Sequence, residues 1–397
     1  MPNRSKGSPV GRIYLDNNST TSIDPRVAAA IEPYIREAYG NPSNLHSYGR
    51  ECAEGLAEAR EQVAAFIGAD VEEVFFTGSG TESDNWAVKG VACAVGPGKH
   101  IVTSPIEHGA VLGACRYMGE LGWKVSLLLV DGYGRVDPEA VRRALTDSTA
   151  LVSVMLVNNE IGTIEPVRKI AAICHERGVL CHTDAVAAVG KIEVAVDDLG
   201  VDLLTISGHK LHAPKGIGVL YVRRGTEIHP FIHGGHQERG MRAGTENVIG
   251  AVGMGKACEL LRNEWREDAA RMKQLRDRLE RGIVERIAEI QVSGHPENRV
   301  CNVLHVTVGY IEGEALLLSL DLEGVAVASG SACSAGEGDA SATVEAIGIS
   351  PLFRNSPVRF SLGRDTTEEE IDRTIDVFEQ VVGRLRDISP LWTNRSG

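Results

Sequence analysis

Short runs of consecutive hydrophobic residues alternate with helical patterns along the first two thirds of the chain. Because the apolar residues in these runs are nearly continuous, the runs are typical of strands buried on both faces of a parallel sheet. Helical patterns between most of the runs predict βαβ units. We therefore expect an α/β fold built on a doubly wound, mostly parallel sheet. The predicted strands are 73–77, 100–104, 124–130, 150–157, 179–185, 202–207 and 217–224.

The first predicted helix begins at Asp24-Pro25, a capping residue followed by proline, and ends near Gly40. The pattern changes in the last third of the chain. Near residue 258 a long, charged helical segment begins and runs to 290, followed by strand-like segments at 302–308 and 358–363 and an amphipathic helix at 366–385. We predict a large domain over 19–260, and a smaller α+β domain formed by 1–18 and 261–397.

Composition narrows the class of protein. The chain has 397 residues, 43% of them hydrophobic and 24% charged, with a net charge of −13. This balance is ordinary for a globular protein, and the acidic charge argues against binding to a nucleic acid backbone. We find no apolar run of about 20 residues and no apolar signal segment near Met1. We expect a cytoplasmic protein without a membrane span.

One of the eight cysteines differs from the others in its surroundings. No two are spaced as CxxC, and seven lie in apolar or helical patterns, which predicts buried thiols in a reducing compartment. Cys333 instead lies in ASGSACSAGEG, at 328–338, a segment with the composition of a solvated loop. A cysteine with little to pack against is a candidate nucleophile.

Several polar residues follow the predicted strands directly, where doubly wound folds bind their ligands. GSGTESDN follows the first strand and could offer backbone N–H groups at a helix start to a phosphate. His108 lies at another predicted helix start, and Asn159, Asp184 and Lys210 follow later strands. A phosphate turn, an aromatic ring, a carboxylate and an amine are the parts that bind pyridoxal 5′-phosphate. Taken singly, each has an ordinary structural explanation.

Two other motifs suggest different ligands. The segment 250–257, GAVGMGKA, fits GxxxxGK but lacks the following Ser or Thr and continues a helical pattern, which disfavours a nucleotide site. His229, His233 and His236 are spaced like metal ligands, but proline and glycine interrupt their segment. We expect no metal site.

The motifs together resemble the NifS-like cysteine desulfurases, pyridoxal phosphate enzymes of aminotransferase class V and fold type I. The resemblance covers essentially the whole chain. It is carried, in order, by YLDNNSTT, GNPSNLHSYGR, FTGSGTESDN, EHGAVL, VNNEIG, HTDA, SGHKLHAPKGIG, GGHQERGMRAGTENV, SGSACS, VRFSLGR and SPLW.

The resemblance implies a role for each candidate residue. Lys210 would be the Schiff-base lysine, His108 the ring stacked on the cofactor and Asp184 the partner of its ring nitrogen. Cys333 would be the nucleophile that receives sulfur from L-cysteine as a persulfide, releasing L-alanine, with His108 as the candidate base. The phosphate would be held by Gly80, Thr81, Ser207 and His209, and by Thr245 from the other subunit of a homodimer, while Asn159 and Arg359 would bind the substrate carboxylate.

The chain departs from the family pattern at two places. Ala187 stands where members commonly have a glutamine that hydrogen-bonds the cofactor, so that bond is missing or comes from another group such as Asn159. The residues 338–344 also differ from the usual continuation after the cysteine. The resemblance further implies an iron–sulfur scaffold or another sulfur acceptor as partner.

Other functions remain open at this point. Selenocysteine lyase or another class V activity such as transamination is the rival among enzymes, although transamination has no use for Cys333. A non-catalytic scaffold or regulatory protein is the rival outside enzymes. The terminal GRLRDISPLW either contacts a scaffold partner or is a helix end packed on its own domain.

Overall fold

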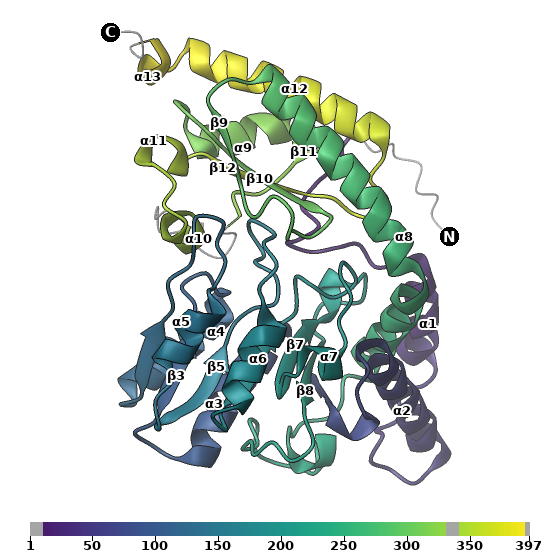
Figure 1. The fold of residues 1–397 in the computed structure, drawn as a ribbon. Helices are drawn as coiled ribbons and strands as arrows, with labels where there is room; N and C mark the ends of the chain where they lie inside the picture. Colours follow the sequence, from purple (N-terminus) through teal and green to yellow (C-terminus); the bar gives the residue numbers. More distant parts are fainter. Residues whose placement is uncertain (1–10, 331–340, 394–397) are drawn as a thin grey trace. The chain divides into compact units, whose positions relative to one another are not determined.

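The computed structural model describes residues 11–330 and 341–393 (Figure 1). The chain forms two compact units. The large unit comprises 20–158 and 163–266, and the small unit 1–19, 159–162 and 267–397. The boundaries lie within the 39-residue helix α8 (Val248–Arg286) and beside the short excursion 159–162.

A seven-stranded sheet forms the centre of the large unit. Five neighbouring strands are parallel, and β8 is antiparallel to both of its neighbours, β2 and β7. β2, β7 and the other parallel strands therefore end at one common edge. The strands, in sheet order, are β2 (Val74–Thr77), β8 (Gly218–Val222), β7 (Leu203–Ser207), β6 (Leu180–Asp184), β5 (Thr149–Ser153), β3 (His100–Thr103) and β4 (Lys124–Leu127).

Every strand predicted for this sheet is present, which confirms the mostly parallel α/β class. Most are shorter than predicted, because the apolar runs continue into buried loops. Leu156 and Val157, for example, follow β5 and are buried without belonging to it. The orientation of β8 could not be read from its apolar run, since a buried antiparallel strand has the same pattern as a buried parallel one.

The helices of the large unit pack in groups on this sheet (Figure 1). α3 and α4 contact each other, and α6 contacts α5 and α7. Asp24 caps α1 as predicted, but the helix ends at Arg36, short of Gly40. The helices are α1 (Pro25–Arg36), α2 (Ser47–Ile67), α3 (Gly80–Val95), α4 (Gly109–Glu120), α5 (Pro138–Ala144), α6 (Val167–His175) and α7 (Val196–Leu199), with 3₁₀ turns η1 (Val71–Glu73), η2 (Gly208–Lys210) and η3 (Gln237–Gly240).

The small unit has an α+β core. Its antiparallel sheet has the order β12-β10-β9, and β1 pairs in parallel with β11. Phe360 and Phe378 meet edge to face at 5.3 Å in its centre. The strands are β1 (Ile13–Tyr14), β9 (Ile290–Ser293), β10 (Val303–Val308), β11 (Val325–Ala326) and β12 (Pro357–Ser361), and the helices α9 (Gly313–Leu322), α10 (Ala342–Ala346), α11 (Pro351–Arg354), α12 (Glu368–Asp387) and α13 (Pro390–Thr393).

Three further expectations can be compared with the structure. The charged helix α8 begins ten residues before 258, because GAVGMGKA is its first part, so this segment forms no phosphate-binding loop. Cys93 is exposed, against the expectation of a buried thiol, since it lies near the carboxyl end of α3 on its outer side. Within the described ranges, we find no helix with both the length and the apolarity that a membrane crossing requires.

Candidate active site

The turns after β2 and β7 meet at the common edge of the large sheet. Thr77 and Ser207 both pair with Gly218, the first residue of the strand between them. A Cβ at Gly218 would lie 2.5 Å from the backbone carbon of Ser79, so only glycine allows this approach. A Cβ at Gly80 would similarly lie 3.2 Å from that of Ser207. Gly80 and Ser207 are therefore neighbours, as the phosphate-site prediction requires.

Helix α3 points its first turn toward this junction. Ser79 caps the helix by accepting from the N–H of Glu82 at 3.1 Å. Glu82 in turn accepts from the N–H of Gly78 and from Arg242, which fixes the turn. Thr81, in the first turn, is exposed and its hydroxyl is available at the helix start. The remaining N–H groups of this turn suit an anion.

His209 and Lys210 follow Ser207 in η2. His209 lies close to Thr20, with Nδ1 3.2 Å from the threonine Oγ1. Burial is the main reason that the pKa of His209 falls to about 4, with the charge of Lys210 second, so the ring is neutral at pH 7. A neutral imidazole can donate one hydrogen bond to a phosphate without adding charge. Lys210 acts electrostatically on both His209 and Asp184.

His108 caps helix α4, as the sequence predicted. Its Nδ1 accepts from the N–H of Ala110 at 3.2 Å, which leaves the hydrogen of the neutral ring on Nε2. His108, Asp184 and Asp84 bring their polar atoms within 4.8 Å of one another. Such a triad could also hold a divalent cation, but the ammonium of Lys210 acts on the same Asp184 carboxylate and disfavours another positive charge.

Asp184 is buried at the end of β6. One of its oxygens accepts from the N–H of Val186 at 2.8 Å. Burial raises its pKa, whereas His108 and Lys210 oppose that rise. Within the described residues, no side-chain donor is bonded to Asp184, so it can accept from a ligand. A carboxylate in this state suits a protonated ring nitrogen.

Two buried acids beside this cluster were not predicted from the sequence. Asp84 is 1% exposed in α3, and Glu107 is 6% exposed just before His108. Burial raises the pKa of Glu107 to about 8 and that of Asp84 well above its ordinary value. The helical spacing contained a signal for Asp84, which shares the face of Gly80, Ala87 and Val88 that packs inward.

The substrate-binding candidates belong to the small unit. Arg359, in β12, is 2% exposed. Its guanidinium donates to the carbonyl of Asn159 at 3.1 Å, to Asp16 at 2.8 Å and to Ser19 at 2.7 Å. Its Nε has no partner among the described residues. The structure therefore brings Asn159 and Arg359 together, and it adds Asp16 as a carboxylate already bound to the guanidinium.

The segment that carries Cys333 lies outside the described residues, but the residues on either side of it converge. Arg359 donates to the carbonyl of Gly330 at 3.3 Å. Ser341 donates to Glu160, and a Cβ at Gly330 would lie 3.1 Å from the same carboxylate. Gly330 and Ser341 are thus both held beside Glu160 in the small unit.

Ala187 and Thr245 are two further positions that the sequence singled out. Ala187 is buried after β6, and no side-chain amide stands at that position. Thr245 is exposed before α8, and no hydrogen bond joins it to the phosphate candidates within the described part of this chain. His229 and His233 contact each other edge to face at 5.3 Å, and the carbonyl of His229 accepts from the indole N–H of Trp86 at 2.9 Å.

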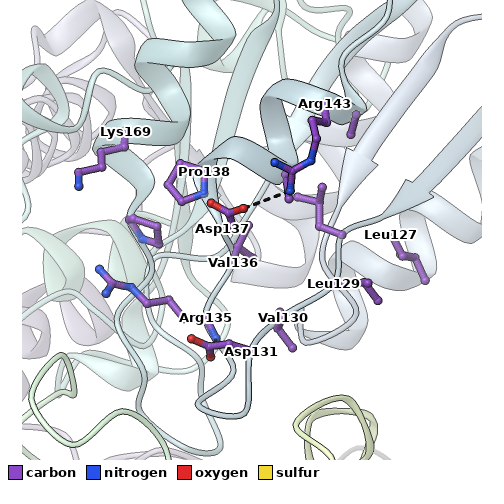
Figure 2. A pocket seen from close by; sticks show the side chains of 14 residues that line it. Leu127, Leu129, Val130, Asp131, Arg135, Val136, Asp137, Pro138, Arg143 and Lys169 are labelled. Atoms are coloured by element: carbon purple, nitrogen blue, oxygen red, sulfur yellow. Dashed lines mark hydrogen bonds and ion pairs between the residues drawn. The ribbon is translucent and has the colours of Figure 1, made fainter.

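A separate cavity of about 780 Å³ lies after β4 (Figure 2). Leu127, Leu129 and Val130 line one part of it, and Asp137 is paired with Arg143 at 3.2 Å across another. None of the predicted site residues lines it. The cavity therefore does not compete with the strand-end cluster as the cofactor site.

Comparisons with known proteins identify the family of this chain. The family model described as Aminotransferase class-V matches residues 13–374. The chain is 48% identical to cysteine desulfurase IscS of Dictyoglomus turgidum, over 95% of this chain and 96% of that protein. It is 44% identical to cysteine desulfurase NifS of Azotobacter vinelandii, over 96% of this chain and 95% of that protein.

Solved structures give the same result. A structure described as a NifS-like protein superposes with a TM-score of 0.89 at 37% identity, covering 94% of this chain and all (100%) of that one. The structure described as SspA in complex with cysteine superposes with a TM-score of 0.80 at 31% identity, covering 90% and 100%. The family and these neighbours are fold type I enzymes that depend on pyridoxal phosphate. The chain belongs to the aminotransferase class V family.

Proposed function

We propose that this protein is a pyridoxal phosphate-dependent cysteine desulfurase, which converts L-cysteine to L-alanine and keeps the sulfur as a persulfide on Cys333. Relatives at 44–48% identity over nearly the whole chain bear that name. We further propose that it acts as a homodimer and passes the sulfur to an iron–sulfur scaffold protein or another acceptor.

One observation carries the proposal. Asp184, His108 and Lys210 meet at the sheet edge to which the Gly80 and Ser207 turns also lead. An acceptor for a ring nitrogen, an aromatic ring, an amine and an anion cradle match the four parts of the cofactor. When bound there, pyridoxal phosphate supplies an electron sink that weakens bonds to the substrate's Cα.

The residues of the large unit hold and orient the cofactor. Lys210 is the amine that would hold the cofactor by its aldehyde. Asp184 would keep the ring nitrogen protonated, since a carboxylate stabilises that charge. His108 presents its ring face as a stacking surface. Its Nδ1 must leave the Ala110 N–H before it can accept a proton.

The residues of the small unit suit the substrate and the sulfur. Arg359 can pair with the substrate carboxylate, as a planar guanidinium does well, once Asp16 shares or yields its place. Cys333 would attack as the thiolate. Its Sγ bonds to the substrate sulfur while the substrate Cβ–S bond breaks, and a proton returned to the carbon completes alanine.

The state of the other cysteines suggests a reducing compartment. Cys174 and burial raise the pKa of Cys181 well above its ordinary value, and both residues are free thiols. Cys52, Cys115 and Cys258 are likewise free and buried. Thiols in contact persist where glutathione and thioredoxin keep them reduced. We therefore propose the cytoplasm as the site of action.

The test is to incubate the purified protein with pyridoxal phosphate and L-cysteine, and to measure alanine and sulfide. We expect equal amounts of both in the presence of a thiol reductant. Lys210→Ala and Cys333→Ala should lose turnover, whereas Cys93→Ala, at an exposed cysteine, should keep it. Full turnover by Cys333→Ala would support transamination or a lyase without a persulfide. Failure to bind the cofactor would support a non-catalytic role.

A further inference from the structure

We infer that Asp84 and Asp184 share a single proton, that this proton resides on Asp84, and that Asp84 is a positioning residue which keeps Asp184 ionised toward the cofactor's ring nitrogen. The inference rests on the proposed function for the part that concerns the cofactor. Its other part, the neutral state of Asp84, concerns the protein alone.

The position of Asp84 supports this inference. It follows Gly80 by four residues in α3, so it lies on the same helical face and points inward behind the phosphate turn. Its side chain is 1% exposed, and Oδ1 has no hydrogen-bond partner within the described ranges. Its carboxylate lies within 4.8 Å of Asp184. Two buried carboxylates this close cannot both ionise without large repulsion.

The surrounding charges decide which acid keeps the proton. His108 and Lys210 favour the charged form of Asp184. Asp84 is instead desolvated and repelled by both Asp184 and Glu107, and these effects raise its pKa well above the ordinary value. A hydrogen bond from Thr205 lowers it by less. The ammonium of Lys210 therefore holds the negative charge on Asp184, and Asp84 is the neutral acid.

Among the described residues, no lysine or arginine forms an ion pair with Asp84. The basic side chain paired with it is His182, whose Nε2 lies 3.7 Å from Asp84 Oδ1. Burial lowers the pKa of His182 to about 3, so its ring is neutral. The ring lies 2.8 Å from Ser153 and 3.1 Å from Thr205, which fixes its orientation. His182 therefore lies beside Asp84 in a fixed orientation, and its neutral ring adds no positive charge there.

The shared proton has a consequence for the cofactor. With Asp84 neutral, one negative charge faces one protonated ring nitrogen, and the buried site stays balanced. The O–H of Asp84 can also donate to Asp184, which would hold that carboxylate in place. Both effects need a neutral donor at position 84 and neither needs a carboxylate there. An asparagine should therefore replace Asp84 well, and an alanine should not.

The test compares Asp84→Asn, Asp84→Ala and wild type, as holoenzyme and as apoprotein. We expect Asp84→Asn to keep the dissociation constant of pyridoxal phosphate within about threefold, and the pH midpoint of its visible absorbance band within about half a unit. Asp84→Ala should weaken binding about tenfold, as loss of one buried hydrogen bond does.

Apoprotein stability gives a readout that does not need the cofactor. In wild type, the unfolded chain releases the Asp84 proton above about pH 4 while the folded chain keeps it, so the melting temperature should fall as pH rises. The Asp84→Asn variant has no proton to release at this position, so its melting temperature should not fall with pH for this reason. Its melting temperature should exceed that of wild type by about 3 °C or more at pH 8, and the difference should close toward pH 4.

The outcomes separate the two proposals. If Asp84→Asn weakens the cofactor as much as Asp84→Ala does, or lowers the melting temperature at pH 8, the shared proton is refuted. A wild type that binds no pyridoxal phosphate would refute the proposed function instead, while the melting curves would still report on Asp84. Asp202→Asn is the matched control, because that buried carboxylate accepts from a backbone N–H. It should lower stability and leave cofactor binding unchanged.

Discussion

Buried acids at the two edges of the large sheet differ in how completely they are hydrogen-bonded. At the edge where the parallel strands begin, Asp202 accepts from the N–H of Cys181 at 2.8 Å and lies 3.1 Å from His175. Glu238 forms two hydrogen bonds of 2.7 Å with Arg60. At the edge where these strands end, Asp84, Glu107 and Asp184 are equally buried, yet Asp84 and Glu107 each keep an oxygen that has no hydrogen-bond partner in the described part of the chain.

This difference indicates that the acids at one edge stabilise the fold and that those at the other edge bind a ligand. Paired acids at the beginning of the strands join elements that are distant in sequence. Acids with few partners at the end of the strands cost stability, since desolvation is not offset. Such groups cluster where a ligand completes their environment, and a ligand site at this edge is what a doubly wound sheet predicts.

The largest effect on stability should come from Glu238→Ala. It leaves Arg60 buried without its partner and removes the acceptor of the Phe76 N–H. We expect a loss of about 3–5 kcal/mol in the free energy of unfolding, measured with a chemical denaturant. Glu176→Ala, which breaks the exposed pair with Arg142, should leave the midpoint unchanged. Equal losses in the two variants would remove the contrast between the edges.

Asp184→Asn should have the largest effect on activity. An amide cannot carry the negative charge that keeps a ring nitrogen protonated, so kcat/KM for L-cysteine should fall by about 10²–10³-fold. The apoprotein should be at least as stable as wild type, because a buried charge has been removed. A variant that kept full activity would show that Asp184 does not act on the cofactor.

A smaller effect should follow from Glu107→Gln and depend on pH. Burial raises the pKa of Glu107 from its ordinary 4.5 to about 8, so the folded chain keeps a proton that the unfolded chain releases. Wild type should therefore lose stability as pH rises from 5 to 8. The variant should gain about 2 kcal/mol on wild type across this window. A constant difference from pH 5 to 8 would mean that Glu107 is ionised when folded.

The smallest effect should be that of Asp202→Asn. The amide oxygen can still accept from Cys181, but the attraction to His175 and Arg223 is lost. We expect about 1 kcal/mol less stability and unchanged kcat for L-cysteine. A loss of activity without a loss of stability would mean that the edge where the strands begin takes part in catalysis, which contradicts this account.

The strands of the large sheet were predicted from the sequence more accurately than their directions and pairings. Buried strands such as β8 stand out because nearly all of their residues are apolar and a turn follows. The direction of β8 and the pairing of β1 with β11 are long-range properties, and no local pattern encodes them. The charged helix was predicted from about 258, and the helical pattern at 250–257 belongs to the same helix, α8, where Gly253 and Gly255 pack closely on Pro214 and Ala59.

In the candidate site, the residues at strand ends could be predicted from the sequence, whereas the residues that contact them could not. His108, Asp184 and Lys210 follow strands, so the fold class alone places them at one edge. The bond between Arg359 and Asp16 joins residues 343 positions apart in sequence, and no spacing reveals it. Asp84 lies in a motif that was interpreted for its glycines and for Thr81, although a carboxylate on the inward face of a helix is itself a signal.

The most direct test of the proposed function is the intact mass of the purified protein before and after incubation with L-cysteine, without reductant. We predict a gain of whole sulfur atoms that digestion maps to Cys333, together with release of alanine. A protein that binds pyridoxal phosphate, releases no alanine and gains no sulfur at Cys333 would contradict the desulfurase proposal.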